Sequence, residues 1–167
     1  AQDDRDLRGS SDRIHQSEPR ARLLLIGYCN AAVEDLVNTP TAIWRTGRVQ
    51  YKEINPHLGA CDLCWLPMRD TGANRGRSPL KIKDYMAAGR PVVATDVGDV
   101  ADLVRRGRFG LLAPDHPRDL ARETLKLLHQ PQQRQAMGRR ARQLAEADFS
   151  WYRIAGRLER FYRGLIE

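Results

Sequence analysis

The sequence predicts an α/β domain built on a doubly wound parallel sheet. Short apolar runs alternate with stretches of helical periodicity along most of the chain, and DLCWLP at Asp62–Pro67 is apolar at nearly every position. A strand of this kind is usually buried on both faces, as in parallel sheets that carry helices on each side. With 167 residues, of which 41% are apolar and 29% charged, the chain is long enough for one domain with a substantial core.

Two strands are expected before Asp62–Pro67. The apolar run LLLIG at Leu23–Gly27 predicts the first strand, and AAVEDLV after it has helical spacing with Asn30 as a plausible N-cap. AIWRTG at Ala42–Gly47 predicts the second strand, followed by a helix near Ile54–Ala60. Each of these strands is expected to feed a helix that covers one face of the sheet.

The chain is expected to contain one domain, residues 21–167, after a polar lead-in at residues 1–20. The lead-in has only two large apolar positions, Leu7 and Ile14. It is therefore expected to be either a partial surface helix or a disordered segment.

A long loop and a short helix follow the third strand. Residues 68–79 are rich in Gly, Asn, Thr, Asp and Arg, which is typical of irregular structure, and a loop of this length is often functional. Ser78 is expected to cap the next helix with Pro79 at its first position, and Gly89 is expected to end it. PVVAT at Pro91–Thr95 predicts the next strand.

The last part of the chain is expected to be mainly helical. A helix at Asp99–Arg106 and a strand at Phe109–Ala113 precede three helices, which start at Pro117 and are broken at Pro131 and Ser150. Apolar residues recur in the last helix at three- and four-residue steps and leave its arginines mostly on the other side. This apolar stripe consists of Trp151, Ile154, Leu158, Phe161, Tyr162 and Leu165.

Composition narrows the classes of function. The formal net charge of +7 indicates attraction to anions in general. The apolar runs are too short for a membrane span, and no secretory signal opens the chain. The chain has an odd number of cysteines: Cys29, Cys61 and Cys64. An odd number favours reduced thiols and therefore a cytoplasmic location. Cys61 and Cys64 form a single CxxC, and a metal site would need a second pair of ligands, which the sequence lacks nearby.

Cations gather at the carboxyl end of the third strand. Arg75, Arg77, Lys81 and Lys83 surround a loop and helix start, where free backbone N–H groups favour an anion such as a diphosphate. The alternative interpretation is a solvated basic face, and Gly76 favours the site because it permits close backbone approach. Asp84, in the same predicted helix, could accept hydrogen bonds from sugar hydroxyls or pair with Lys81.

The same residues carry a family resemblance. RSPLKIKDYMAAGRPVVATDVGDVADLV, then FGLLAP and ADFSWYRIAGRL, resemble the carboxyl-terminal domain of the group 1 (family 4) glycosyltransferases of GT-B architecture. The likeness runs from about residue 20 to Glu167, and ARLLLIG and GRVQYKEINPHLGACDLCWLP agree with it. It implies a single Rossmann-like sheet, half of a GT-B enzyme, with helices at its C-terminal end.

The resemblance also implies an activity and a set of site residues. In this family the domain binds a nucleotide-activated sugar, which is transferred with retention of configuration and generally without a metal ion or other cofactor. By position, Asp84 corresponds to the acid that holds the ribose. The loop around the diphosphate and donor sugar would consist of Gly76, Arg77, Ser78, Pro79, Leu80 and Lys81. The nucleobase would meet Arg48, Val49 and Tyr51.

Two features depart from the family pattern. Many members carry two glutamates eight positions apart, where this chain has Gly76 and Asp84. Complete members also have an amino-terminal domain, which supplies the acceptor site and most catalytic groups. We therefore expect a truncated donor domain, cytoplasmic or peripheral to an anionic inner membrane face, that binds the nucleotide sugar but is inactive alone.

Two other classes of function remain open at this point. The chain could be a non-catalytic nucleotide-binding or partner-interaction module that keeps the fold. The net charge also allows a nucleic-acid binder, but aromatic residues interleaved for base stacking are not evident outside the apolar stripe, so no nucleic acid is expected.

Overall fold

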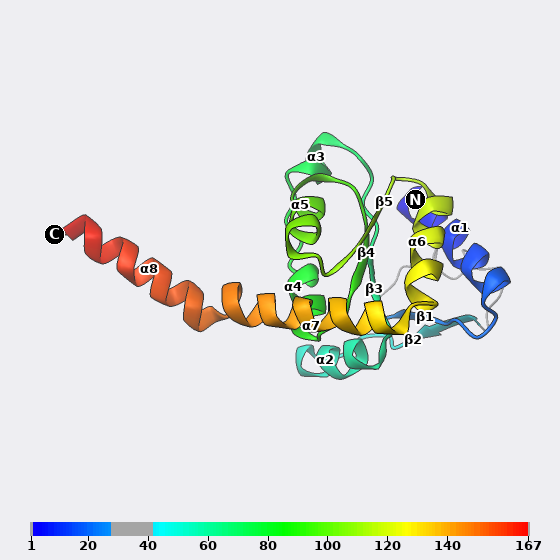
Figure 1. The fold of residues 1–167 in the computed structure, drawn as a ribbon, viewed down its shortest axis with the longest axis horizontal. Helices are drawn as coiled ribbons and strands as arrows, with labels where there is room; N and C mark the ends of the chain where they lie inside the picture. The colour runs from blue at the N-terminus through cyan, green and yellow to red at the C-terminus, as the bar shows by residue number, and fades with distance from the viewer. Residues whose placement is uncertain (1, 28–41, 167) are drawn as a thin grey trace.

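The structure is a computed structural model that describes residues 2–27 and 42–166 (Figure 1). Cys29 and the helix predicted after Asn30 lie outside the described residues.

All hydrogen-bonded strand pairs among the described residues are parallel. Strand β1 (Leu23–Leu25) pairs with β2 (Ile43–Arg45), and β3 (Cys64–Leu66), β4 (Val92–Thr95) and β5 (Gly110–Ala113) form a second sheet in that order. The predicted α/β class with a parallel sheet is confirmed. The strands expected in one continuous ladder form two hydrogen-bonded groups in the described part of the chain.

Helices alternate with the strands. They are α1 (Gln2–Ser17), α2 (Tyr51–Ala60), α3 (Gly72–Arg75), α4 (Lys81–Ala87), α5 (Gly98–Gly107), α6 (Pro117–Leu128), α7 (Pro131–Asp148) and α8 (Trp151–Ile166). The expected breaks at Pro131 and Ser150 are confirmed. Helix α2 begins earlier than the predicted Ile54, because Gln50 and Glu53 form a capping box at its start.

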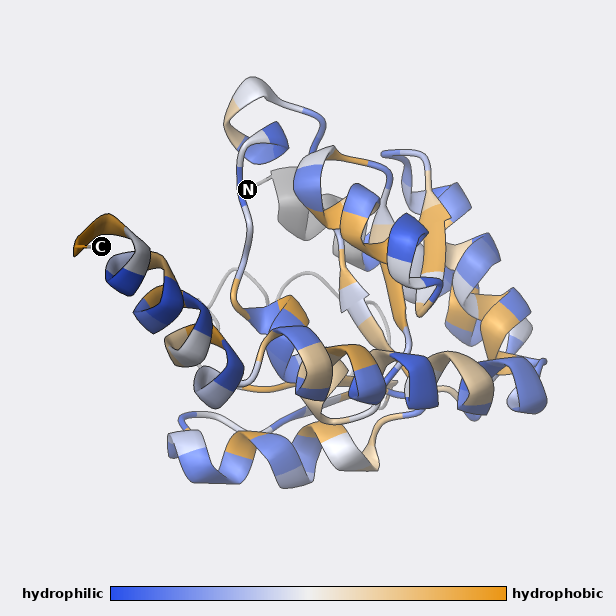
Figure 2. Cartoon of the chain, turned by 60° about the vertical axis from the view of Figure 1, so that its left-hand side comes forward, coloured by the Kyte–Doolittle hydropathy of each residue, from blue (hydrophilic) through white to orange (hydrophobic). Residues whose placement is uncertain are grey.

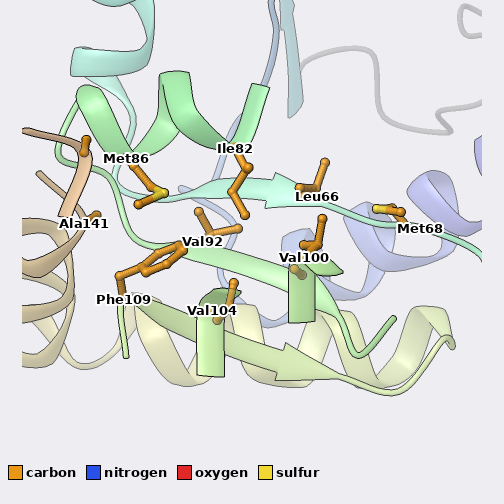
Figure 3. Close-up of a cluster of buried hydrophobic side chains, with 11 residues drawn as sticks. Leu66, Met68, Ile82, Met86, Val92, Val100, Val104, Phe109 and Ala141 are labelled. Atoms are coloured by element: carbon orange, nitrogen blue, oxygen red, sulfur yellow. The ribbon is translucent and has the colours of Figure 1, made fainter. Parts of the chain in front are cut away.

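The core has two layers, one on each face of the β3-β4-β5 sheet. Successive residues of β4 point to opposite faces, so Val92 and Ala94 join one cluster and Val93 joins the other. The first cluster includes residues of α4, α5 and α7, and Figure 3 shows Ile82, Met86, Val100, Val104, Phe109 and Ala141 in it. The second lies under α6. Both faces are therefore covered, as the apolar strands predicted.

The segment at residues 1–20, expected as a lead-in, contains α1, which packs against α6. Ser10 is fully buried, and its hydroxyl donates to the carbonyl oxygen of Pro117 at 3.0 Å. A Cβ at Gly9 would lie 3.3 Å from the Pro117 side chain. Small residues let the two helices approach closely, so α1 needs few large apolar side chains to pack on the body.

Helix α8 extends away from the body beyond α7 (Figure 1). No residue of α8 is buried. Within the described residues, no helix combines the length and apolar character needed to cross a membrane.

Candidate functional site

The candidate site is the segment between β3 and α4, at the carboxyl end of the β3-β4-β5 sheet. Thr95, at the end of β4, fixes its start: the Thr95 hydroxyl accepts from the backbone N–H of Met68 and donates to the Met68 carbonyl oxygen, both at 2.7 Å. Thr95 is only 4% exposed. These two buried hydrogen bonds join the ends of neighbouring strands in place of a continued ladder.

The following residues form an ordered turn. The Thr71 side chain accepts from Asn74 N at 3.2 Å and caps α3. The Arg75 guanidinium donates to both carboxylate oxygens of Asp70, at 2.6 and 3.0 Å, and this hydrogen bonding lowers the pKa of Asp70. Asp70 N donates in turn to Asp115 Oδ2 at 2.8 Å. Side-chain hydrogen bonds therefore hold the loop, which was expected to be irregular.

Helix α3 rests on the start of α5. Gly98 has φ +55°, and a Cβ on it would lie 2.1 Å from the carbonyl oxygen of Arg75. Only glycine fits this backbone-to-backbone approach, both because of the space and because of the left-handed conformation. This contact between Gly98 and Arg75 fixes the position of α3, and of the loop that contains it, relative to α5.

The start of α4 differs from the prediction. The N-cap is Leu80, without a side-chain cap, so the expectation that Ser78 caps this helix is wrong. Ser78 Oγ instead accepts from Lys83 Nζ at 2.8 Å. The expected end is confirmed, since Gly89 has φ +66° and its N–H donates to the Met86 carbonyl oxygen at 2.9 Å.

The four cations have different surroundings. Arg75 is held by Asp70, and Lys83 bonds Ser78 and lies 5.7 Å from the Phe149 ring centroid. Burial lowers the pKa of Lys83, although nearby Asp99 acts in the opposite direction. Arg77 and Lys81 are exposed, and no carboxylate within the described residues forms an ion pair with either. Arg77 and Lys81 are thus the cations available to an anionic ligand.

Gly76 and Leu80 line the same exposed stretch. Gly76 has φ −90°, and a Cβ there would meet no atom within 4 Å. The fold itself therefore does not require glycine at this position. Leu80 is 80% exposed, so an apolar side chain stands beside the two cations.

Asp84 lies in the first turn of α4, partly buried. Desolvation by burial raises the pKa of its carboxyl. The alternative pairing with Lys81 is not formed, and the described part of the chain provides no other cation in an ion pair with Asp84. The Asp84 carboxylate thus has no ion-pair partner in the described part of the chain, and it follows the exposed Arg77 and Lys81 by seven and three positions in sequence. A carboxylate and cations in one segment suit a ligand that has both hydroxyl and phosphate groups.

The expected nucleobase residues are in another part of the fold. Arg48 and Tyr51 are exposed and Val49 is half-buried, between β2 and α2. No hydrogen bond or ion pair described for the chain joins them to residues 76–84. In Figure 1, α4, which carries Lys81 and Asp84, lies between α3 and α2. Residues 76–84 thus form one continuous segment that includes Asp84, and no described contact joins it to the residues expected to meet the nucleobase.

The described cysteines and acids do not form a metal site. Across residues 2–27 and 42–166, no group of three or more His, Cys, Asp or Glu side chains is placed to hold a metal ion. Cys61 and Cys64 are free, and burial raises the pKa of both thiols, that of Cys64 to about 12. These are properties of small packed side chains.

Two positions that support the site, Thr95 and Gly98, were missed in the sequence, and the contact made by Lys83 was not foreseen. Thr95 and Gly98 follow a predicted strand, a place where loop anchors are common, but their partners are 27 and 23 residues away in sequence and could not be inferred. Lys83 was grouped with the other cations because spacing alone does not distinguish a cation that bonds a serine from one that faces solvent.

The sequence matches the profile of the family described as "Glycosyl transferases group 1" over residues 7–130. A mannosyltransferase from Corynebacterium glutamicum, GDP-mannose-dependent and acting on a monoacylated phosphatidylinositol monomannoside, is 29% identical over 152 residues, which are 87% of this chain and 40% of the relative. D-inositol 3-phosphate glycosyltransferase from Paenarthrobacter aurescens is 41% identical over 84 residues, 50% of this chain and 20% of the relative.

Solved structures share the fold. Sucrose-phosphate synthase from Thermosynechococcus elongatus superposes with a TM-score of 0.78 at 23% identity, over 97% of this chain and 42% of that protein. HepE from Anabaena in complex with UDP-glucose gives a TM-score of 0.72 at 21% identity, over 93% of this chain and 44% of that protein. This chain thus spans less than half the length of each of these relatives and structural neighbours.

Proposed function

Because this chain belongs to the group 1 glycosyltransferases, we propose that it is the donor-nucleotide-sugar domain of a retaining, metal-independent hexosyltransferase. The family supports a transferase, and the parallel α/β fold matches glycosyltransferase domains. The base, the sugar and the acceptor are not part of the proposal.

The observation that carries the proposal is that Asp84 has no ion-pair partner among the described residues, while the exposed cations Arg77 and Lys81 stand in the same segment, residues 76–84. The carboxylate can accept hydrogen bonds from the two ribose hydroxyls, and the cations can bind the diphosphate. Leu80 and Gly76 then border the sugar. HepE, which shares this fold, binds UDP and UDP-glucose, and this supports a ligand of the same chemical class.

The proposed chemistry is electrostatic. As the bond between the sugar and the diphosphate breaks, negative charge builds up on the departing phosphate oxygens. Arg77, Lys81 and the backbone N–H groups before α4 would stabilise that charge without moving, the role of a preorganised site. Because these cations and N–H groups would stabilise the charge of the departing diphosphate, a metal ion would be dispensable.

The nucleobase is assigned to Arg48, Val49 and Tyr51 by resemblance. For one nucleotide to reach both groups, the loop after β2 must approach the start of α4. Arg90, whose guanidinium donates to the Gly59 carbonyl oxygen, connects the end of α2 to the turn after α4. This hydrogen bond links the position of α2 to that of α4.

The proposal also includes a further part of the enzyme, outside these 167 residues. Since the chain spans less than half of its relatives, the acceptor site and most catalytic groups are assigned to a further domain or partner chain. The 167 residues alone would bind donor without transferring sugar. Free Cys61 and Cys64 support a cytoplasmic location for the domain.

Calorimetric titration with UDP, GDP and ADP tests the proposal. We expect one nucleotide to bind preferentially, and Asp84→Ala, Arg77→Ala and Lys81→Ala to weaken it, each by roughly tenfold. Asp148→Ala and Arg139→Ala are matched controls, because both residues are exposed on α7 and remove the same charges. Binding that the site variants and the control variants affect equally would refute the assigned site.

The second candidate function is a module that keeps the fold without donor chemistry. Gly76, at the position of the family's first glutamate, favours it, because a contact to the transferred sugar is then lacking. Titration with whichever of UDP, GDP and ADP the chain prefers, and with the sugar-bearing form of that nucleotide, distinguishes the two functions. A donor domain is expected to bind the sugar-bearing form at least as tightly as the nucleotide alone. A non-catalytic nucleotide-binding module would bind the nucleotide alone more tightly, and a partner-interaction module would bind neither.

A further inference from the structure

Lys83 is a cation that the fold keeps partly out of solvent. Its side chain is half-buried, and its Nζ lies 5.7 Å from the centroid of the Phe149 ring, which packs on the first core cluster. In Figure 2 the helices around the sheet are banded hydrophobic and hydrophilic, as expected of helices with one buried side and one exposed side. A lysine on such a helix usually extends its ammonium into water, so the partial burial of Lys83 calls for a compensating interaction.

The compensating interaction is a hydrogen bond to Ser78. Lys83 lies in the first turn of α4, and its Nζ donates to Ser78 Oγ, in the segment before the helix, at 2.8 Å. Desolvation lowers the pKa of Lys83, and the nearby carboxylate of Asp99, in the first turn of α5, acts in the opposite direction. Asp99 therefore favours the charged ammonium, which is the form that donates to Ser78.

The bond to Lys83 decides what the Ser78 hydroxyl can do. An ammonium has three N–H donors and no acceptor, so the serine oxygen can only accept from it. The hydroxyl proton of Ser78 is then left to be donated elsewhere. Ser78 is exposed, and its hydroxyl donates to no acceptor within the described residues. The proton is thus available to an acceptor that arrives from solution.

We propose that Lys83 is a positioning residue of the donor site, which holds the Ser78 hydroxyl so that it donates its proton to the diphosphate of the bound nucleotide. The inference rests on the proposed function, which assigns Ser78 to the loop around the diphosphate. Phosphate oxygens are strong hydrogen-bond acceptors and match a hydroxyl that has only its proton left to offer. The bond from the ammonium also makes that hydroxyl a better donor, because hydrogen bonds in a chain polarise one another.

Lys81 and Lys83 thus have different roles, although only one residue separates them. Lys81 is exposed and has no ion-pair partner among the described residues, so its ammonium can reach the ligand directly. The ammonium of Lys83 is occupied by Ser78 and lies beside the Phe149 ring. Lys83 therefore acts through Ser78, whereas Lys81 acts through its own charge.

A double-mutant cycle on the full chain tests the inference. Affinity is measured by calorimetric titration with whichever of UDP, GDP and ADP binds best, for Ser78→Ala, Lys83→Met and the two changes together. We expect Ser78→Ala to weaken binding by roughly tenfold and Lys83→Met by roughly fivefold. In the Ser78→Ala background, Lys83→Met should have no further effect. Lys83→Arg keeps N–H donors for Ser78 and should restore most of the affinity.

Two further lysine variants are controls. Lys81→Met removes a cation that is assigned to the ligand, and it should weaken binding with or without the Ser78 hydroxyl. Lys126 is exposed on α6 and forms an ion pair with Glu123 at 3.7 Å. Lys126→Met removes the same charge as Lys83→Met and should leave the affinity unchanged. Thermal melts without nucleotide show whether each variant remains folded.

The outcomes separate this inference from the function on which it rests. If a nucleotide binds and Asp84→Ala weakens it, the donor site stands. Equal weakening by Lys83→Met with and without the Ser78 hydroxyl would then overturn the inference alone, since Lys83 would act by its charge or by stabilising α4. An unchanged affinity of Lys83→Met would also overturn it. No binding of UDP, GDP or ADP by the unmodified chain would refute the donor site and the inference together.

Discussion

The α carbon of Gly98 faces the backbone of Arg75 so closely that a Cβ on Gly98 would lie 2.1 Å from the Arg75 carbonyl oxygen and 2.6 Å from its α carbon. This contact joins the start of α5 to the end of α3, and α3 belongs to the loop that presents Arg77 and Lys81. The position of the candidate site therefore depends on a residue outside it.

Gly98→Ala is expected to lower the free energy of unfolding by at least about 2 kcal/mol, from strain in the left-handed region and the backbone clash. Gly76→Ala is the matched control, because Gly76 has φ −90° and open space around it. That change should leave the stability unchanged or raise it by up to about 1 kcal/mol. Urea denaturation measures both, and equal effects of the two substitutions would contradict the proposed role of Gly98.

Thr95→Val is expected to cost about 1–3 kcal/mol, because the buried N–H and carbonyl groups of Met68 would lose their partner. Thr95→Ser keeps the hydroxyl and should cost less. The change should also weaken nucleotide binding, since Met68 begins the loop that carries the site. Denaturation midpoints and calorimetry compare the two variants; a Val variant as stable as the Ser variant would show that these bonds are unimportant.

Asp84→Asn is expected to stabilise the free protein at neutral pH while weakening nucleotide binding. Burial raises the pKa of the Asp84 carboxyl in the folded state, so folding favours its protonated form. The contribution of Asp84 to stability is then full below the unfolded pKa of about 3.9 and is lost as the pH rises through the higher folded pKa. Thermal melts of both proteins from acidic to neutral pH should show a gap that widens with pH. A gap that is constant would contradict the burial of this group.

The thiols of Cys61 and Cys64 are expected to react slowly with a disulfide reagent at pH 8. Burial raises the pKa of Cys64 to about 12 and also raises that of Cys61, so little thiolate is present at this pH. A Cys29→Ser background confines the signal to these two residues. Reaction in denaturant should be at least tenfold faster, since thiols of ordinary pKa are then available. Rapid reaction of the native protein would contradict the burial of these thiols and indicate that the CxxC is reactive.

Patterns in the sequence predicted much of the architecture. Apolar runs gave the positions of β1 to β5, because buried parallel strands are apolar on both faces. Proline and serine gave the starts of α7 and α8, and glycine the end of α4, because these residues have strong local backbone preferences. The packing of α1 was not predicted, since Gly9 and Ser10 stabilise it by being small and not by being apolar.

The candidate site was predictable only as a stretch of chain. Residues 76–84 could be selected because cations, glycine and an acid follow a buried strand. The sequence alone determined which residues gather at this end of the sheet and that α8 is amphipathic, because both depend on local order along the chain. Tertiary structure decided the rest: Lys83 bonds Ser78 and Arg75 bonds Asp70, Asp84 remains unpaired, and the apolar face of α8 is exposed. The two pairings join residues only five positions apart, but they form only in the folded turn and helix between those residues. Burial depends on groups from distant segments, which come together only when the chain has packed.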